Sequence, residues 1–151
     1  LTIEQGAASE AFTEQRAQML TFYLTLTEVL KANRSLVMLL LPTGKNQLQA
    51  WKNLKSAKKV FLDFVKMLDI KIEALSFIPS DKVKEKTIEA AAWAQFLSVL
   101  GFWMKDDSPN FDRTDIFIEK SLKLSFEISD STILHSIVDL GKFVTQNEET
   151  R

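Results

Sequence analysis

The sequence has no cysteine, one histidine, three prolines and four glycines among its 151 residues. Without cysteine, the chain has no disulfide, no thiol nucleophile and no cysteine ligand for zinc. A single histidine, His135, excludes catalytic schemes that need two. Since strands are joined by turns rich in glycine and proline, their scarcity disfavours an all-β fold and favours a few long helices. No apolar run approaches the roughly 20 residues of a membrane span, so we expect no membrane segment.

The charges are balanced, with 19 Lys and Arg against 20 Asp and Glu, for a net charge of -1. A domain that grips phosphate backbones is normally basic, so this balance disfavours direct nucleic-acid binding. The hydrophobic fraction of 46% and the charged fraction of 26% are ordinary for one globular domain. The chain begins with Leu1 rather than Met, from which we expect it to be part of a longer protein.

Apolar residues at helical spacing predict an all-α bundle of five to six helices. Residues 1–9 are interpreted as a linker or the tail of a connecting helix, and residues 146–151 as a flexible tail. The single domain between them covers residues 10–145. The predicted helices span 10–32, 35–41, 47–77, 81–105, 113–128 and 132–144.

The predicted helix 81–105 is apolar on all sides in its second half. Its large side chains gather on one half of the helix, and its small residues, Ala94, Ser98 and Gly101 among them, gather on the other. Because such a helix must be covered all round, we expect a second chain to cover one side. Helix 113–128 has a similarly wide apolar arc, so two copies could build an intermolecular four-helix bundle. The alternative is that the small residues fit a tight contact within the chain.

The residues give little support to catalysis or to a metal site. Asp106 and Asp107 could hold a proton or a metal, but an Asp-Asp-Ser-Pro run is typical of a turn, and Asp112 is a plausible N-cap. His135 lacks a partner nucleophile, and four lysines within 52–59 are typical of a solvated face. We therefore expect no catalytic residue, no metal and no cofactor. Tyr23 and Gln95 are polar groups on apolar helices, suited either to orienting a ligand or to local hydrogen bonds.

Two segments, EVLKANRSLVMLLL and FWMKDDSPNFDRTDIFIEKSLKLSFEI, resemble the C-terminal regulatory domain of TetR-type transcriptional regulators. The closest likeness is to a Bacteroidetes-like branch with a tryptophan-rich helix before a D-D-S-P turn. The resemblance covers Thr13 to Val144. It implies a cytoplasmic homodimer that binds DNA only through an N-terminal helix-turn-helix domain, which this chain lacks.

The resemblance also implies two sets of site residues. An effector pocket for a small lipophilic or aromatic molecule has as its candidate lining Tyr23, Leu26, Met38, Phe61, Phe64, Trp93 and Phe96. The dimer interface falls on helices 81–105 and 113–128, with candidates Ala94, Ser98, Gly101, Phe102, Phe117, Ser121, Leu124 and Ile128.

A second hypothesis belongs to another class of protein. A helical chain without a DNA-binding head could act as a stand-alone carrier of a hydrophobic ligand or as a protein-interaction module. A helix-turn-helix domain encoded upstream of Leu1 would favour the regulator, and its absence would favour the carrier. An enzyme ranks third, since no set of residues supports one.

Overall fold

The computed structural model describes residues 3–41, 50 and 52–149, and all regular structure in these ranges is helical. The fold is therefore all-α, as the sequence predicts. Its α-helices are α1 (Ile3–Ala32), α2 (Arg34–Leu40), α4 (Lys55–Leu68), α5 (Asp81–Lys105), α6 (Asp112–Ser129) and α7 (Thr132–Glu149). Two short 3-10 turns, η1 (Glu73–Leu75) and η2 (Pro109–Phe111), precede α5 and α6.

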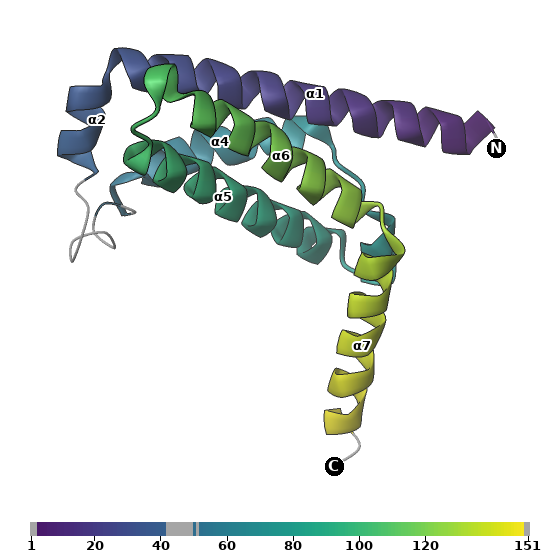
Figure 1. Ribbon diagram of the computed structural model, residues 1–151. Helices are drawn as coiled ribbons and strands as arrows, with labels where there is room; N and C mark the ends of the chain where they lie inside the picture. Colours follow the sequence, from purple (N-terminus) through teal and green to yellow (C-terminus); the bar gives the residue numbers. More distant parts are fainter. Residues whose placement is uncertain (1–2, 42–49, 51, 150–151) are drawn as a thin grey trace.

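Four helices enclose the core, and α7 lies apart from them. In Figure 1, α1 runs along one edge of the bundle, α5 and α6 lie side by side, and α4 lies behind them. The N-terminal end of α1 and the base of α7 lie at the same end of the bundle (Figure 1). From there α7 projects away from the bundle, on the side opposite α1.

The core is built mainly from aromatic and branched side chains of these four helices. Tyr23, Val99, Trp103 and Ile118 are fully buried, and Phe61 is nearly so. Burying each large apolar side chain contributes about 1.5–3 kcal/mol to folding. The bulky half of α5 that the sequence assigns to a core therefore does pack inward, with Phe96, Leu100 and Trp103 at its centre.

The predicted bounds of α5 are confirmed at both ends. Ser80 precedes the helix in an extended conformation, and its Oγ accepts a hydrogen bond from the Val83 N–H at 3.4 Å. This is an N-cap that satisfies one of the free N–H groups of the first turn. The helix ends at Lys105, before the Asp-Asp-Ser-Pro turn.

The predicted helix 47–77 is wrong at its C-terminal end, because α4 stops at Leu68. Asp69 takes a left-handed conformation (φ 49°, ψ 49°), which aspartate tolerates better than most residues. The chain then passes through an extended Ile72 into η1, where Leu75 is buried. The N-terminal part of the prediction, residues 47–49 and Trp51, lies outside the described residues.

Three further helix ends differ from the prediction. The first helix begins at Ile3 rather than Glu10, and the last continues to Glu149 rather than ending at Val144. Asp112 is not the N-cap of α6 but its first residue, and Phe111 occupies the N-cap position. The side chain that caps this helix comes from Asp106, as described below.

Candidate functional site

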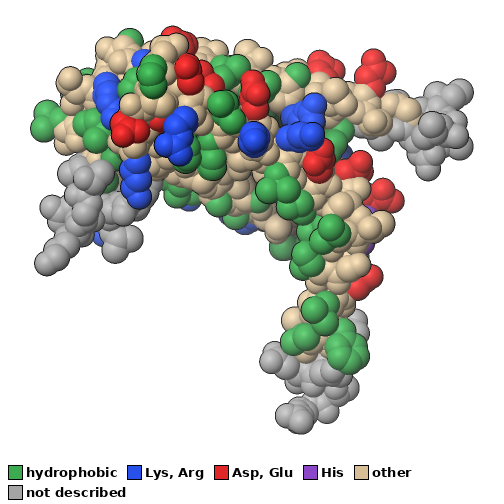
Figure 2. Space-filling model, in the orientation of Figure 1, with side chains coloured by type: hydrophobic (Ala, Val, Ile, Leu, Met, Phe, Trp, Pro, Cys, Tyr) green, Lys and Arg blue, Asp and Glu red, His purple; other side chains and the backbone are tan. Residues whose placement is uncertain are grey.

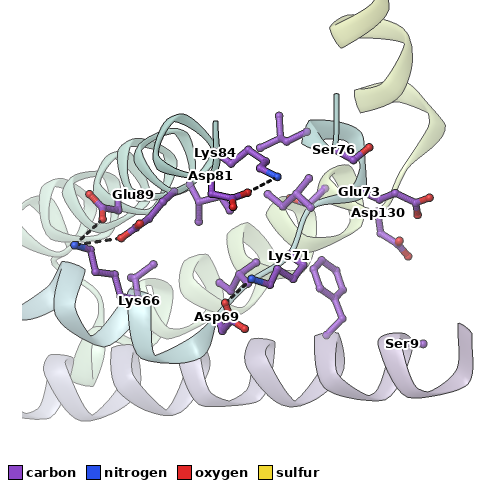
Figure 3. A pocket seen from close by; sticks show the side chains of 18 residues that line it. Ser9, Lys66, Asp69, Lys71, Glu73, Ser76, Asp81, Lys84, Glu89 and Asp130 are labelled. Carbon is purple, nitrogen blue, oxygen red and sulfur yellow. Dashed lines mark ion pairs between the residues drawn. The ribbon is translucent and has the colours of Figure 1, made fainter. Parts of the chain in front are cut away.

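A cavity lies where the end of α4, η1 and the first half of α5 face the start of α1 (Figure 3). Its volume is about 920 Å³, within the usual range of small-molecule sites. The lining combines apolar and charged side chains. Its apolar members include Phe12, Val65, Ile70, Ile72, Leu75 and Ile88.

Ion pairs line the wall of the cavity. Lys66 of α4 lies 3.2 Å from Glu85 and 3.2 Å from Glu89 of α5, bridging the two helices. The hydrogen bonds that the Lys66 ammonium donates to these carboxylates raise its pKa. Two local pairs, Lys71 with Asp69 and Lys84 with Asp81, lie nearby (Figure 3). A ligand with an apolar body and a polar or charged group would match this lining.

The cavity is physically connected to α1. Ser9 and Phe12 of α1 form part of its lining, and the Phe12 ring lies 4.8 Å from that of Phe126 on α6. Next to it, Gln15 Nε2 donates a 2.8 Å hydrogen bond to the carbonyl of Leu68, the last residue of α4. That bond satisfies a carbonyl that the helix end leaves free. A shift of the α4 end would therefore pull on the first half of α1.

The predicted pocket residues lie mostly elsewhere, in a closed aromatic cluster between α1, α4 and α5. Phe61 packs against Phe96 with ring centroids 4.9 Å apart, and Phe96 stacks on Trp93 at 4.9 Å. Tyr23 completes the cluster at 6.2 Å from Phe61. The structure thus brings these four residues together, but their rings contact one another and none of them lines the cavity.

The remaining three predicted pocket residues lie at the edges of this cluster. Leu26 and Phe64 are half-buried and line a shallow groove of about 610 Å³ beside α1, separate from the first cavity. Met38, on α2, is also half-buried against the core. The prediction that these seven residues line an effector pocket stays a prediction.

The two polar groups on the apolar helices differ in their hydrogen bonding. Gln95 is satisfied locally, because its Nε2 donates to Ser121 Oγ on α6 at 2.7 Å. The Tyr23 hydroxyl is buried and finds no hydrogen-bond partner among the described residues. Burial raises the pKa of that hydroxyl, so it stays protonated. An unpaired buried hydroxyl costs free energy, as do the buried Trp103 Nε1 and Asp115 Oδ1, which also find no partner among the described residues.

The predicted dimer residues on α5 lie away from the core. Ala94 and Ser98 are exposed, and Gly101 and Phe102 are half-buried. A Cβ built on Gly101 meets no described atom within 4 Å. The small residue at position 101 is therefore not required by a contact within the described part of the chain, which argues against the tight intrachain contact considered above.

The predicted dimer residues on α6 form a stripe beside those of α5. Phe117, Ser121, Leu124 and Ile128 follow one another at spacings of four, three and four residues, about a third of a turn from the buried Ile118 and Leu122. Leu124 is 57% exposed and Ile128 is 39% exposed. Phe117 stacks on Phe102 of α5, with centroids 4.5 Å apart and planes 4° from parallel. The eight candidate residues thus lie on one continuous face of α5 and α6.

Asp106 fixes the turn between these two helices. Its side chain is buried (5% exposed) and accepts hydrogen bonds from the Ser108 N–H at 2.9 Å, the Thr114 N–H at 2.9 Å and Thr114 Oγ1 at 2.6 Å. Burial raises the pKa of Asp106, but these hydrogen bonds outweigh it and lower the pKa to about 2. The carboxylate therefore caps the N-terminus of α6, which is the structural role that the sequence favours.

A second contact supports the same turn from the other side. The Arg34 guanidinium lies 4.8 Å from the Trp103 ring centre and 4.7 Å from that of Phe111. Asn110 and Phe111 both have positive φ, a conformation that is unfavourable for a bulky residue and persists here through these contacts. Contacts within the chain therefore fix the position of α6 relative to α5.

The other candidates from the sequence make only surface contacts, such as the 3.3 Å ion pair of Lys59 with Asp63 and the 5.5 Å approach of the Lys58 ammonium to the Trp93 ring centre. His135 is exposed on α7, and Lys52, Lys55, Lys58 and Lys59 are exposed on one side of the molecule. In the described ranges, no group of three or more acidic or histidine side chains could hold a metal ion. Within those ranges too, every helix is too short or too polar to cross a membrane.

Comparison with known families identifies the class of this domain. The family model for the tetracyclin repressor-like C-terminal domain matches residues 18–144, which cover most of the chain, including the second half of α1 and all of α4, α5 and α6. The chain therefore belongs to this family, in agreement with the resemblance found in its sequence. Searches of curated proteins and of solved structures find no match.

The charged cavity could not be predicted from the sequence. Its lining comes from α1, α4, η1, α5 and the end of α6, so no single segment carries a recognisable pattern. In the sequence, nothing distinguishes Lys66, Glu85 and Glu89 from ordinary exposed charged residues of a helix. Only the early end of α4, at Asp69, brings them to the same wall.

Proposed function

We propose that this chain is the effector-sensing and dimerisation domain of a TetR-type transcriptional regulator whose DNA-binding head is a separate N-terminal domain. Membership of the tetracyclin repressor-like C-terminal family supports this function most strongly. The near-neutral charge agrees with it, because DNA contact then falls to another domain. The homodimer forms through the shared face of α5 and α6.

We propose the cavity between α4, η1 and α5 as the effector site, with an amphipathic small molecule as its ligand. The support is its size, its apolar floor with charged wall, and its contact with Ser9 and Phe12 of α1. A ligand that binds one packing of α4 against α1 more tightly shifts the equilibrium toward that packing. The size of the shift is set by the difference between the ligand's affinities for the two packings. In the dimer, that shift changes the distance between the two N-terminal DNA-binding domains, which must be about 34 Å apart to meet successive major grooves.

A titration with the fluorescent probe 8-anilinonaphthalene-1-sulfonate tests the site, since this probe has an apolar body and one negative charge. Ile88→Trp places a larger side chain in the cavity lining, next to the Lys66 ion pairs, and should weaken probe binding at least about tenfold. Ile116→Trp is the matched control, because Ile116 is 51% exposed on α6, outside the cavity lining. Binding that persists in Ile88→Trp would reject the cavity.

The same titration compares the cavity with the predicted aromatic pocket. Phe61→Leu opens space in the aromatic cluster without touching the cavity lining. If Phe61→Leu changes probe affinity and Ile88→Trp does not, the effector site lies among the seven predicted residues. If neither variant differs from the control, neither site takes this class of ligand.

A further inference from the structure

Carboxylates outnumber lysines in the lining of the cavity between α4, η1 and α5. Three lysines line it, and each forms an ion pair with a carboxylate of the same lining. Six carboxylates line it, those of Asp69, Glu73, Asp81, Glu85, Glu89 and Asp130. Since carboxylates and lysines are both ionised at neutral pH, three negative charges remain without a matching lysine.

The surplus charge lies at both ends of the cavity. Lys66 is 3.2 Å from Glu85 and 3.2 Å from Glu89, so its single charge is shared between two carboxylates. Glu73 of η1 and Asp130, which follows α6, are exposed and lie at the end away from Lys66, where no ion pair joins them to another lining residue (Figure 3). That end therefore offers two carboxylates to a positive charge.

Neighbouring groups do not neutralise this end of the cavity. The Lys142 ammonium of α7 lies 3.7 Å from the ring centre of Phe77, two residues beyond η1, but it pairs with Asp139 at 3.8 Å and is not part of the lining. Across the part of the chain that the structure describes, no three acidic or histidine side chains form a group that could hold a metal ion. The separate carboxylates suit an organic cation, which needs one or two opposite charges rather than a full shell of oxygen ligands.

Apolar side chains lie next to these carboxylates. Ile72 and Leu75, on either side of Glu73 in the sequence, belong to the same lining, as do Ile70 and Phe12 of α1. The cavity thus combines an apolar surface with uncompensated negative charge. This combination is complementary to a molecule with an apolar body and a positive charge.

We propose that the cavity selects amphipathic amines, with the ammonium group at the end of Glu73 and Asp130 and the apolar body against Ile72 and Leu75. The inference rests on the effector site proposed above and names the chemical class of its ligand. An anionic ligand gains less, because each lysine of the lining is already paired and would first have to leave its carboxylate. The anionic probe used above is then held mainly by the apolar residues and represents the weaker class of ligand.

Two fluorescent probes that differ in charge test this selectivity on the full chain. Dansylcadaverine has a naphthalene body and a primary amine that is protonated at neutral pH, and its N-acetyl derivative keeps the body and the chain without the charge. We expect the wild type to bind dansylcadaverine at least about fivefold more tightly, since two carboxylates attract the ammonium. Raising the ionic strength toward about 0.15 M, where charges more than about 8 Å apart are screened, should reduce this ratio.

Charge-removing variants locate the effect. Glu73→Gln combined with Asp130→Asn should bring the two dissociation constants within about twofold of each other, because this end of the cavity loses its negative charge. Glu119→Gln is the matched control, since Glu119 is an exposed carboxylate of α6 outside the cavity lining, and it should leave the ratio unchanged. All three positions are exposed, so these substitutions should leave the fold intact.

Ile88→Trp separates a failure of the selectivity from a failure of the site. If both probes bind the wild type equally and Ile88→Trp weakens both, the preference for amines is overturned and the effector cavity stands. If neither probe binds, or if Ile88→Trp leaves both affinities unchanged, the cavity and the preference are overturned together. A preference for the amine that persists in the double variant overturns the role of Glu73 and Asp130.

Discussion

Replacing Asp106 by asparagine should destabilise the domain by about 2–4 kcal/mol. The carboxylate accepts three hydrogen bonds of 2.6–2.9 Å while almost fully buried. Asparagine keeps the shape but offers one acceptor oxygen and turns an amide N–H toward another donor. Hydrogen bonds to a charged group contribute about 1.5–3 kcal/mol each, and an unsatisfied buried donor adds a penalty. The loss is a large share of the roughly 5–15 kcal/mol that stabilises a typical domain.

Thermal unfolding by circular dichroism measures this loss, with Asp107→Asn as the control. Asp107 is the neighbouring residue, is exposed, and accepts no hydrogen bond from the described part of the chain. At about 2–4 °C per kcal/mol for a domain of this size, Asp106→Asn should lower the midpoint by roughly 5–15 °C. Asp107→Asn should shift it by about 2 °C or less. Equal midpoints for the two variants would refute the capping role of Asp106.

The pH dependence of stability gives a second check on the same residue. The pKa of Asp106 is about 2 in the folded chain, against about 3.9 for an unfolded aspartate. Because the folded pKa is the lower one, the contribution is complete above about pH 4 and is lost as the pH falls toward 2. Asp106→Asn should therefore lose less stability than the wild type between pH 4 and pH 2.

Three other substitutions, at Tyr23 and Gly101, test the core and the seam. Tyr23→Phe removes a buried hydroxyl without a described partner, so the free energy of unfolding should stay the same or rise by up to about 1 kcal/mol; a clear loss would mean that the hydroxyl is paired. Gly101→Ala should raise the free energy of unfolding by about 0.5–1 kcal/mol, because the added Cβ has free space in the monomer. Gly101→Leu should weaken the dimer in light scattering, and an unchanged dimer would place the seam elsewhere.

The long helices could be predicted from sequence because their signals are local. Ser80 and the Asp-Asp-Ser-Pro run mark the two ends of α5. In the second half of this helix, the large apolar side chains indicate the side that packs in the core, and the small residues indicate the side that lies away from it. The end of α4 could not be predicted in this way. No glycine or proline marks Asp69, and apolar residues continue at helical spacing through Ile72 and Leu75 although the chain has already turned.

The candidate site was harder to predict than the fold, because its residues come together only in the tertiary structure. The aromatic residues were recognised as a group, but a sequence cannot tell whether large rings surround a space or fill it; here Phe61, Trp93 and Phe96 contact one another. The sequence favours Asp112 as the N-cap of α6, because aspartate is a preferred N-cap residue. The side chain that caps the helix, Asp106, reaches across the turn.

The projection of α7 away from the bundle could not be predicted from the sequence either. Its apolar residues predict a helix with a buried face, and they fit a helix packed on its own bundle equally well. The exposed Ile133, Ile137 and Leu140 become informative only when the structure places them away from the core.

The central claim is that this domain dimerises through α5 and α6, and one measurement tests it most directly. Light scattering should give the wild-type chain about twice its mass of 17.2 kDa. Leu124→Glu, within the proposed seam, should give the mass of a monomer. Ile116→Glu, equally exposed on the same helix but outside the seam, should remain a dimer. A wild-type monomer, or a dimer that Leu124→Glu leaves intact, would contradict the proposed interface.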